Sequence, residues 1–138
     1  MSARPSFDAI VEDVLRAGRA VSFVAPGTSM EPTIHDGETI TVEPRRPEEV
    51  RRGQIAVYAS PAGLRAHRLI RRPRRRSGSF TVRGDAAQVP SESVPLESIL
   101  GIAVAVGRPG GQVSLRSARI PLLVRVRRLR FIIRALFA

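Results

Sequence analysis

The sequence predicts a single mainly β domain, a β barrel or sandwich, with a short helix before it and a basic amphipathic helix after it. Short apolar and β-branched runs recur along the chain between turns rich in glycine and proline, which is typical of antiparallel β structure. Hydrophobic residues make up 43% of the 138 residues, and a chain of this length can bury one substantial core. Residues 119–138 then combine apolar and arginine side chains at helical spacing.

Each element is predicted from a local pattern. Residues 7–19 carry apolar side chains at helical spacing, and Gly18 suits the end of that helix. Two alternating runs flank "SPAG", whose proline and glycine fit a type I turn, so a hairpin is expected there. The predicted strands are 20–25, 38–42, 54–59, 64–71, 80–83 and 98–107. The chain therefore divides into an N-terminal helix (1–20), a β domain (21–107) and a basic C-terminal segment (108–138) that is expected to be helical.

The composition restricts the chemistry. There is no cysteine, which excludes disulfides, thiolate metal sites and cysteine nucleophiles, and no motif calls for a cofactor. All 23 basic residues are arginines, and arginine cannot act as a general base. His35 and His67 are therefore the only side chains with an ordinary pKa near neutrality.

The net charge of +11 suggests an anionic partner, and most of the excess lies near the C-terminus, where eight arginines and no acid follow Glu97. On a helical wheel of 119–138, one face holds the apolar residues Leu122, Val126, Leu129, Ile133, Leu136 and Phe137. Arg127, Arg130 and Arg134 share another face. This pattern is typical of helices that lie on an anionic membrane surface, although a helix packed on its own domain is the alternative.

Neither a signal peptide nor an apolar run of about 20 residues is recognisable in the sequence. A cytoplasmic or peripherally membrane-associated protein is therefore expected. Specific nucleic-acid binding is not expected, because only 4% of the residues are aromatic and an arginine-rich loop such as "RRPRRR" is usually a solvated one.

Ser29, in "GTSMEPTIHDGETITV", is the candidate nucleophile. A serine hydroxyl needs a base within hydrogen-bond reach, and here only a histidine or a carboxylate can serve. His67 lies on the second hairpin strand, in "LRAHRLI", whereas His35 lies in the exposed turn "IHDGE". His67 is thus the favoured base. Asp85, in "VRGDAA", is the candidate third group that would orient the imidazole, although Gly-Asp is also common in turns.

These stretches resemble a known superfamily. "GTSMEPTIHDGETITV" resembles the nucleophile box of the signal peptidase I and SOS-repressor autoprotease superfamily, and "RRGQIAVYASPAGLRAHRLIRR" resembles its base-bearing hairpin. "VRGDAA" is similar to the later Gly-Asp box, and "ILGIAVAVG" to the strand that follows. The resemblance covers residues 20–107, with all four boxes in order.

The resemblance implies a serine endopeptidase with a polypeptide substrate. Ser29 would attack the scissile carbonyl, and His67 would be the general base of the histidine type, because the chain has no lysine. Asp85 would orient His67 or shape the site. The Ser29 amide would form the oxyanion hole, since Gly27 offers no hydroxyl. Met30 and Pro32 would shape the loop and the substrate groove.

The sequence also departs from the superfamily pattern. Gln54 replaces the usual aspartate after Gly53, and Glu38 stands where aspartate often follows glycine. The asparagines and further aspartate that often follow the Gly-Asp box are missing, and Glu92 is the only nearby acid. The transmembrane anchor of true signal peptidases is not recognisable, so a short, anchorless member is expected.

Two alternatives to cleavage of a separate substrate stay open. The chain could be a self-cleaving regulator, since the SOS-repressor relatives cut their own Ala-Gly bond, and this sequence contains Ala17-Gly18 and Ala62-Gly63. Those relatives, however, use lysine as base and carry a DNA-binding domain upstream. The other alternative is a non-catalytic basic β domain that binds nucleic acid or an anionic membrane.

Overall fold

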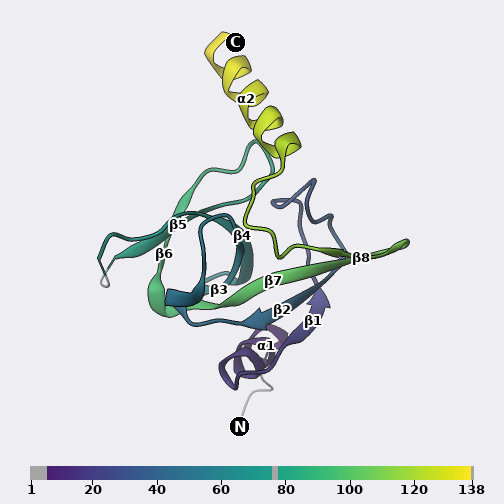
Figure 1. Ribbon diagram of the computed structural model, residues 1–138, viewed down its shortest axis with the longest axis vertical. Coiled ribbons are helices and arrows are strands. Elements are labelled where there is room, and N and C mark those ends of the chain that lie inside the picture. Colours follow the sequence, from purple (N-terminus) through teal and green to yellow (C-terminus); the bar gives the residue numbers. More distant parts are fainter. Residues whose placement is uncertain (1–5, 76–77, 138) are drawn as a thin grey trace.

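The computed structural model describes residues 6–75 and 78–137 and contains one curled antiparallel sheet with a helix at each end of the chain (Figure 1). The helices are α1 (Phe7–Arg16) and α2 (Leu122–Phe137). The strands are β1 (Val21–Val24), β2 (Thr39–Pro44), β3 (Ile55–Ser60), β4 (Gly63–Arg71), β5 (Ser79–Arg83), β6 (Glu92–Pro95), β7 (Ile99–Arg108) and β8 (Gly111–Ser114). Short 3-10 turns lie at Pro47–Glu49 and Leu96–Ser98. The mainly β fold predicted from the sequence is confirmed.

The sheet runs in the order β1-β2-β7-β3-β4-β5-β6, and β8 pairs with β7. All pairs are antiparallel. The β3–β4 hairpin has Ser60 opposite Gly63, and this register places Ala56 opposite His67. The long β7 lies between β2 and β3, so it joins the two halves of the sheet.

Three sequence expectations need correction. The segment 108–138 is helical only over Leu122–Phe137, because the proline at 121 disfavours helical backbone at the residue before it. Within that segment, 111–114 is instead the strand β8, which has four exposed residues and therefore no apolar pattern to predict it. Strand β6 was also not expected, since only Val94 of its four residues is buried. The first helix ends at Arg16 rather than at 19, and Gly18 follows with a positive φ of 83°.

Apolar side chains fill both faces of the central strands. On β3, Ile55 and Val57 belong to one buried cluster, which also contains Val11 and Leu15 of α1. Ala56 and Tyr58 alternate with them and belong to a second cluster, formed with side chains of β4, β5, β6 and β7. Strands β3 and β4 thus form a rigid support for any side chain that they carry.

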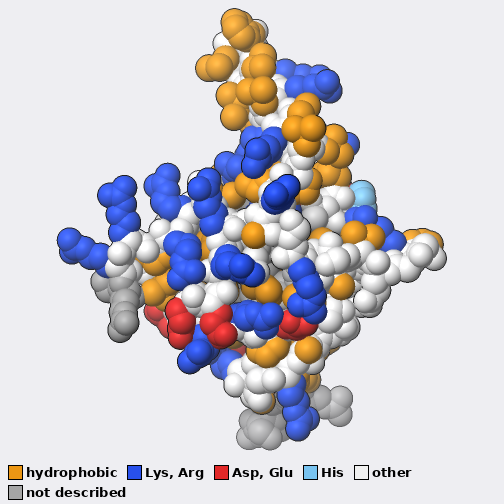
Figure 2. Space-filling view, in the orientation of Figure 1, with side chains coloured by type: hydrophobic (Ala, Val, Ile, Leu, Met, Phe, Trp, Pro, Cys, Tyr) orange, Lys and Arg blue, Asp and Glu red, His pale blue; other side chains and the backbone are white. Residues whose placement is uncertain are grey.

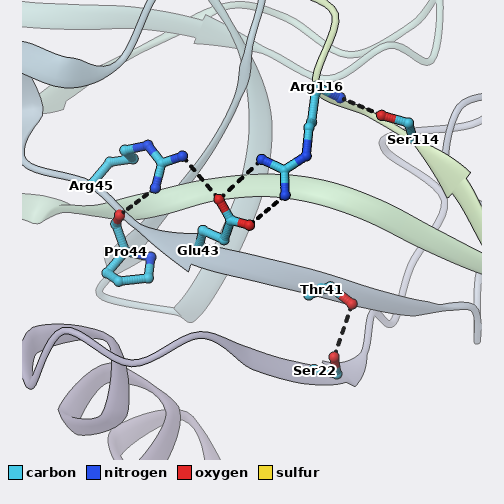
Figure 3. Close-up of polar contacts among 7 residues, drawn as sticks. All are labelled: Ser22, Thr41, Glu43, Pro44, Arg45, Ser114 and Arg116. Carbon is cyan, nitrogen blue, oxygen red and sulfur yellow. Dashed lines mark hydrogen bonds and ion pairs between the residues drawn. The ribbon is translucent and has the colours of Figure 1, made fainter.

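The connection between β8 and α2 is held against the sheet. The Arg116 guanidinium donates to both oxygens of Glu43 at 3.1 and 2.5 Å, and Arg45 donates to the same carboxylate at 2.9 Å (Figure 3). Arg116 and then Arg45 lower the pKa of Glu43 to about 2. Nearby, a Cβ atom at Gly53 would come within 1.6 Å of the Ala118 carbonyl oxygen, so two backbones pack closely there. The chain therefore enters α2 from a fixed position.

The two helices lie at opposite ends of the molecule, and α2 projects away from the sheet (Figure 1). The face shown in Figure 2 carries many arginines and few acids, and apolar side chains cover much of the projecting helix. Neither helix in the described part of the chain combines the length and apolarity needed to cross a bilayer.

Candidate active site

Ser29 lies in the loop between β1 and β2, just after a sharp change of chain direction. Gly27 adopts a φ of 95°, which favours glycine, and its amide donates to a carboxylate oxygen of Asp36 at 2.7 Å. Two backbone hydrogen bonds close the loop: the Ala25 amide donates to the Glu38 carbonyl at 2.9 Å, and the Gly37 amide donates to the Ala25 carbonyl at 3.0 Å. The loop conformation is thus fixed by backbone contacts, and Ser29 is half-buried within it.

The residues after Ser29 anchor the loop in the core. Met30 and Ile34 are both buried in the first apolar cluster. The Met30 carbonyl accepts hydrogen bonds from the Thr33 and Ile34 amides at 2.9 and 3.0 Å. Pro32 lies within this turn, and the Glu31–Pro32 peptide bond is cis. Met30 therefore anchors the Ser29 loop in the core.

His67 lies on β4 and reaches Ser29 from the sheet. Its side chain is only 4% exposed, and its Nε2 atom lies 3.1 Å from the Ser29 Oγ atom. The two residues are 38 positions apart in the sequence. The structure thus brings the predicted nucleophile and the predicted base within hydrogen-bond distance.

The other imidazole nitrogen contacts a tyrosine. His67 Nδ1 lies 3.1 Å from the Tyr58 hydroxyl and 3.7 Å from a carboxylate oxygen of Glu92. The Tyr58 hydroxyl in turn donates to that same Glu92 oxygen. Tyr58 and His67 share a face because β3 and β4 pair Ala56 with His67, two residues from Tyr58.

The hydrogen-bond capacities of these groups decide where the protons lie. A carboxylate only accepts, so the single Tyr58 proton goes to Glu92. The Tyr58 oxygen must then accept from His67 Nδ1–H, and in the neutral imidazole this leaves Nε2 without a proton. Nε2 is therefore the acceptor for the Ser29 hydroxyl. We call Ser29, His67, Tyr58 and Glu92 the reactive network.

Burial governs the ionisation of this network. Desolvation lowers the pKa of His67, and Arg65 acts in the same direction, whereas Glu92 and Asp85 oppose the shift. Burial, followed by the hydrogen bond to Glu92, raises the pKa of Tyr58. His67 is consequently neutral at neutral pH, the state that a general base needs, and Tyr58 keeps its proton.

Asp85 is not hydrogen-bonded to His67, which a role in orienting the imidazole would require. Its carboxylate accepts from the Arg68 guanidinium at 2.8 and 2.6 Å and from the Thr33 hydroxyl at 2.5 Å, and it makes no hydrogen bond to His67. The reason is strand alternation: Arg68 follows His67 on β4 and points to the opposite face. Arg68 also donates to the Gly53 carbonyl at 2.7 Å. We call Arg68 and Asp85 the structural ion pair.

The Gly-Asp segment nevertheless touches the loop that carries Ser29. The Ala86 amide donates to the Ser29 carbonyl at 3.0 Å. A Cβ atom at Gly84 would lie 2.3 Å from the same carbonyl oxygen, so only glycine allows this approach. Together with the Thr33–Asp85 bond, these contacts hold the Ser29 loop in place.

A pocket of about 250 Å³ opens beside Ser29 and His67. Gly27, Met30 and Ala66 contribute to its wall, together with apolar side chains such as Phe23, Ile40 and Leu64. Pro32 belongs to the same loop but does not line the pocket. The pocket therefore combines apolar side chains with polar groups, and the Ser29–His67 pair lines it.

The remaining candidates are readily placed. None of the hydrogen bonds within the described part of the chain uses the Ser29 amide, so this donor is available beside Oγ. His35 is exposed, and its ring nitrogen lies 3.6 Å from a carboxylate oxygen of Glu31. These contacts do not support a role for His35 as the base of Ser29. Across residues 6–75 and 78–137, no group of three or more His, Asp or Glu side chains could hold a metal ion.

Sequence reasoning missed Tyr58 and did not assign a role to Glu92. A signal for Tyr58 was present, because the "SPAG" turn fixes the hairpin register and hence the face that Tyr58 shares with His67. Glu92 lies on β6, whose short polar sequence gives no strand pattern.

Comparison with known protein families gives a match. A family model described as "Peptidase S24-like" matches residues 5–106, which include the whole reactive network and the structural ion pair. No curated protein matches the chain significantly.

Proposed function

Because the chain belongs to the Peptidase S24-like family, we propose that it is a serine endopeptidase in which Ser29 is the nucleophile and His67 the general base. The observation that carries the proposal is the 3.1 Å contact between Ser29 Oγ and His67 Nε2, two residues that line the same pocket. Such a pair is the arrangement that makes a serine hydroxyl reactive.

The proposed reaction proceeds through an acyl-enzyme. His67 Nε2 takes the proton of Ser29 Oγ as this oxygen bonds to the scissile carbonyl carbon. The Ser29 amide donates to the resulting oxyanion. The imidazolium then gives its proton to the leaving amine as the carbon–nitrogen bond breaks, and water hydrolyses the ester with His67 again as base.

Tyr58 and Glu92 are positioning residues in this proposal. Their hydrogen bonds keep the proton of neutral His67 on Nδ1, so that Nε2 faces Ser29 as an acceptor. Glu92 also stabilises the imidazolium that forms during the reaction, because its negative charge lies 3.7 Å from Nδ1. Asp85 acts on the site by holding the nucleophile loop.

A separate polypeptide is favoured as the substrate over the chain itself. Both Ala-Gly bonds of the sequence lie in turns that hydrogen bonds tie to regular elements: the Gly18 amide donates to the Leu15 carbonyl just after α1, and Gly63 pairs with Ser60 at the end of the hairpin. Ala62 does line the pocket, which makes Ala62-Gly63 the better candidate for self-cleavage. Cutting it would require the hairpin to open, at the cost of its ladder bonds.

The test uses the full chain and an unfolded peptide mixture, with new termini identified by mass spectrometry. Ser29→Ala and His67→Ala are each expected to lower cleavage on the order of a thousandfold or more. Thr28→Ala is the matched control, because it removes the neighbouring exposed hydroxyl and is expected to leave cleavage unchanged. Undiminished cleavage by folded Ser29→Ala protein would rule the proposal out.

Intact mass during the same incubation separates the two modes of cleavage. Loss of the full-length mass in a Ser29-dependent manner, with fragments ending at Ala62 or Ala17, would assign self-cleavage. Binding of an anionic membrane surface by residues 119–138 is compatible with either mode, since α2 contributes nothing to the pocket wall.

A further inference from the structure

One face of α2 is fixed to the body of the protein. Val124 is buried, with 6% of its surface exposed. One turn further along, the Arg128 guanidinium donates to the carbonyl oxygen of Val89 at 2.6 Å and to that of Ala87. These carbonyls belong to the loop that follows β5, so Val124 and Arg128 define the attached face of the helix.

The opposite face is apolar and uncovered. At about 100° per residue, six apolar side chains fall within a stripe of about 100° whose centre lies roughly opposite the attached face. The apolar stripe consists of Leu122 (75% exposed), Val126 (36%), Leu129 (57%), Ile133 (45%), Leu136 (73%) and Phe137 (85%). The attachment of α2 thus leaves its most apolar side pointing away from the protein.

Arginines border the apolar stripe on both sides. On the helical wheel Arg125 lies along one edge, and Arg127, Arg130 and Arg134 lie along the other. The space-filling view shows basic side chains beside apolar ones on the projecting helix (Figure 2). No acid follows Glu97 in the sequence, so nothing on α2 neutralises them.

We propose that α2 docks this protein on an anionic lipid surface, with the apolar stripe inserted at the boundary of the acyl chains and the flanking arginines on lipid phosphates. An anionic lipid surface accommodates both the apolar stripe and the flanking arginines. Nucleic acid would pair with the arginines and leave six apolar side chains in water. A second copy of α2 packed stripe to stripe would bring two sets of arginines together without a counter-charge.

The proposal does not depend on the peptidase proposal, since lipid binding involves no residue of the reactive network. Its test is sedimentation of the full chain with phosphatidylcholine vesicles, with or without phosphatidylglycerol. Binding is expected only with phosphatidylglycerol, and salt should weaken it. Equal binding to both vesicle types, or to neither, would overturn the proposal.

Two variants separate the contributions of charge and apolar surface. Arg127→Gln/Arg130→Gln/Arg134→Gln should lose about fivefold in affinity for each arginine, on the order of a hundredfold together. The matched control is Arg52→Gln/Arg74→Gln/Arg75→Gln, which removes the same charge from exposed positions outside α2 and should lose much less. Leu129→Ser/Ile133→Ser keeps every charge and should lose at least tenfold. Unchanged binding by the Leu129/Ile133 variant would contradict insertion of the stripe.

A fluorescent label tests the orientation of the helix directly, because the chain has no cysteine of its own. An environment-sensitive label attached through Leu136→Cys should shift to the blue on anionic vesicles. The same label attached through Ala135→Cys, on the attached side of the wheel, should not shift. Equal shifts at both positions would overturn the proposal. So would tight binding to duplex DNA that requires the arginines but not the apolar stripe. A dimer that requires the apolar stripe and forms without any vesicle binding would overturn it as well.

Discussion

The adjacent residues His67 and Arg68 begin two polar networks that differ in almost every respect. His67 leads through neutral hydroxyl and imidazole groups to Glu92, whose side chain is 43% exposed. Arg68 leads to Asp85, and both of those side chains are nearly fully buried, at 4% and 2% exposure. The reactive network borders a pocket, whereas the structural ion pair carries charges whose partners are all within the protein. One strand therefore carries the groups of the proposed reaction on one face and a buried ion pair on the other.

The largest effect is expected from breaking the structural ion pair. Asp85→Ala leaves the Arg68 guanidinium buried without its counter-charge, which should lower the free energy of unfolding by about 3–5 kcal/mol. Urea unfolding measures this loss. If Asp85→Ala protein cannot be purified folded, Asp85→Asn keeps the shape of the side chain and allows the same measurement.

A double replacement checks the cause. Arg68→Met/Asp85→Leu removes both charges together and should recover most of the lost stability. A double variant no more stable than Asp85→Ala would show that packing, and not the uncompensated charge, accounts for the loss.

A smaller effect, on activity, is expected from Tyr58→Phe. The substitution removes the acceptor for His67 Nδ1–H, so the imidazole loses the contact that holds its tautomer. The cleavage rate should fall about tenfold, which corresponds to about 1.4 kcal/mol of transition-state stabilisation. Tyr58→Phe should also change the pH dependence of kcat/KM, which a merely structural tyrosine would leave unaltered.

The smallest effect concerns the pH dependence itself. Cleavage by the unmodified protein should rise with pH through an ionisation below about 6.5, since burial lowers the pKa of His67 and only the neutral imidazole is a base. Glu92 opposes this shift by stabilising the imidazolium. Glu92→Gln should therefore move the midpoint to lower pH and reduce the rate severalfold. A midpoint that moves to higher pH in Glu92→Gln would contradict the contact between Glu92 and His67.

Much of this architecture could be predicted from the sequence. The four boxes identified the superfamily, which the family match confirms, and they selected Ser29 and His67, which the structure brings within 3.1 Å. The "SPAG" hairpin was predicted almost to the residue, because turn chemistry and alternation agree there. A role in catalysis for these residues stays a prediction.

The rest could not be predicted for identifiable reasons. Which carboxylate meets which cation depends on the paths of loops far apart in the sequence, so Asp85 could not be assigned to Arg68 instead of His67. The four residues of β6 give no strand pattern, and it is the pairing of β6 with β5 that positions Glu92 near His67. The wheel of 119–138 showed an apolar face, but not that Val124 and Arg128 would turn this face outward.

The close approach of Gly84 to the Ser29 carbonyl limits the movement of the Ser29 loop. Because two backbones are in contact there, a change of side-chain rotamer cannot relieve the contact. A single added methyl group at position 84 would lie 2.3 Å from that oxygen and push it away. The alignment of Ser29 with His67 thus depends on the absence of a side chain at a residue that touches neither of their reacting atoms.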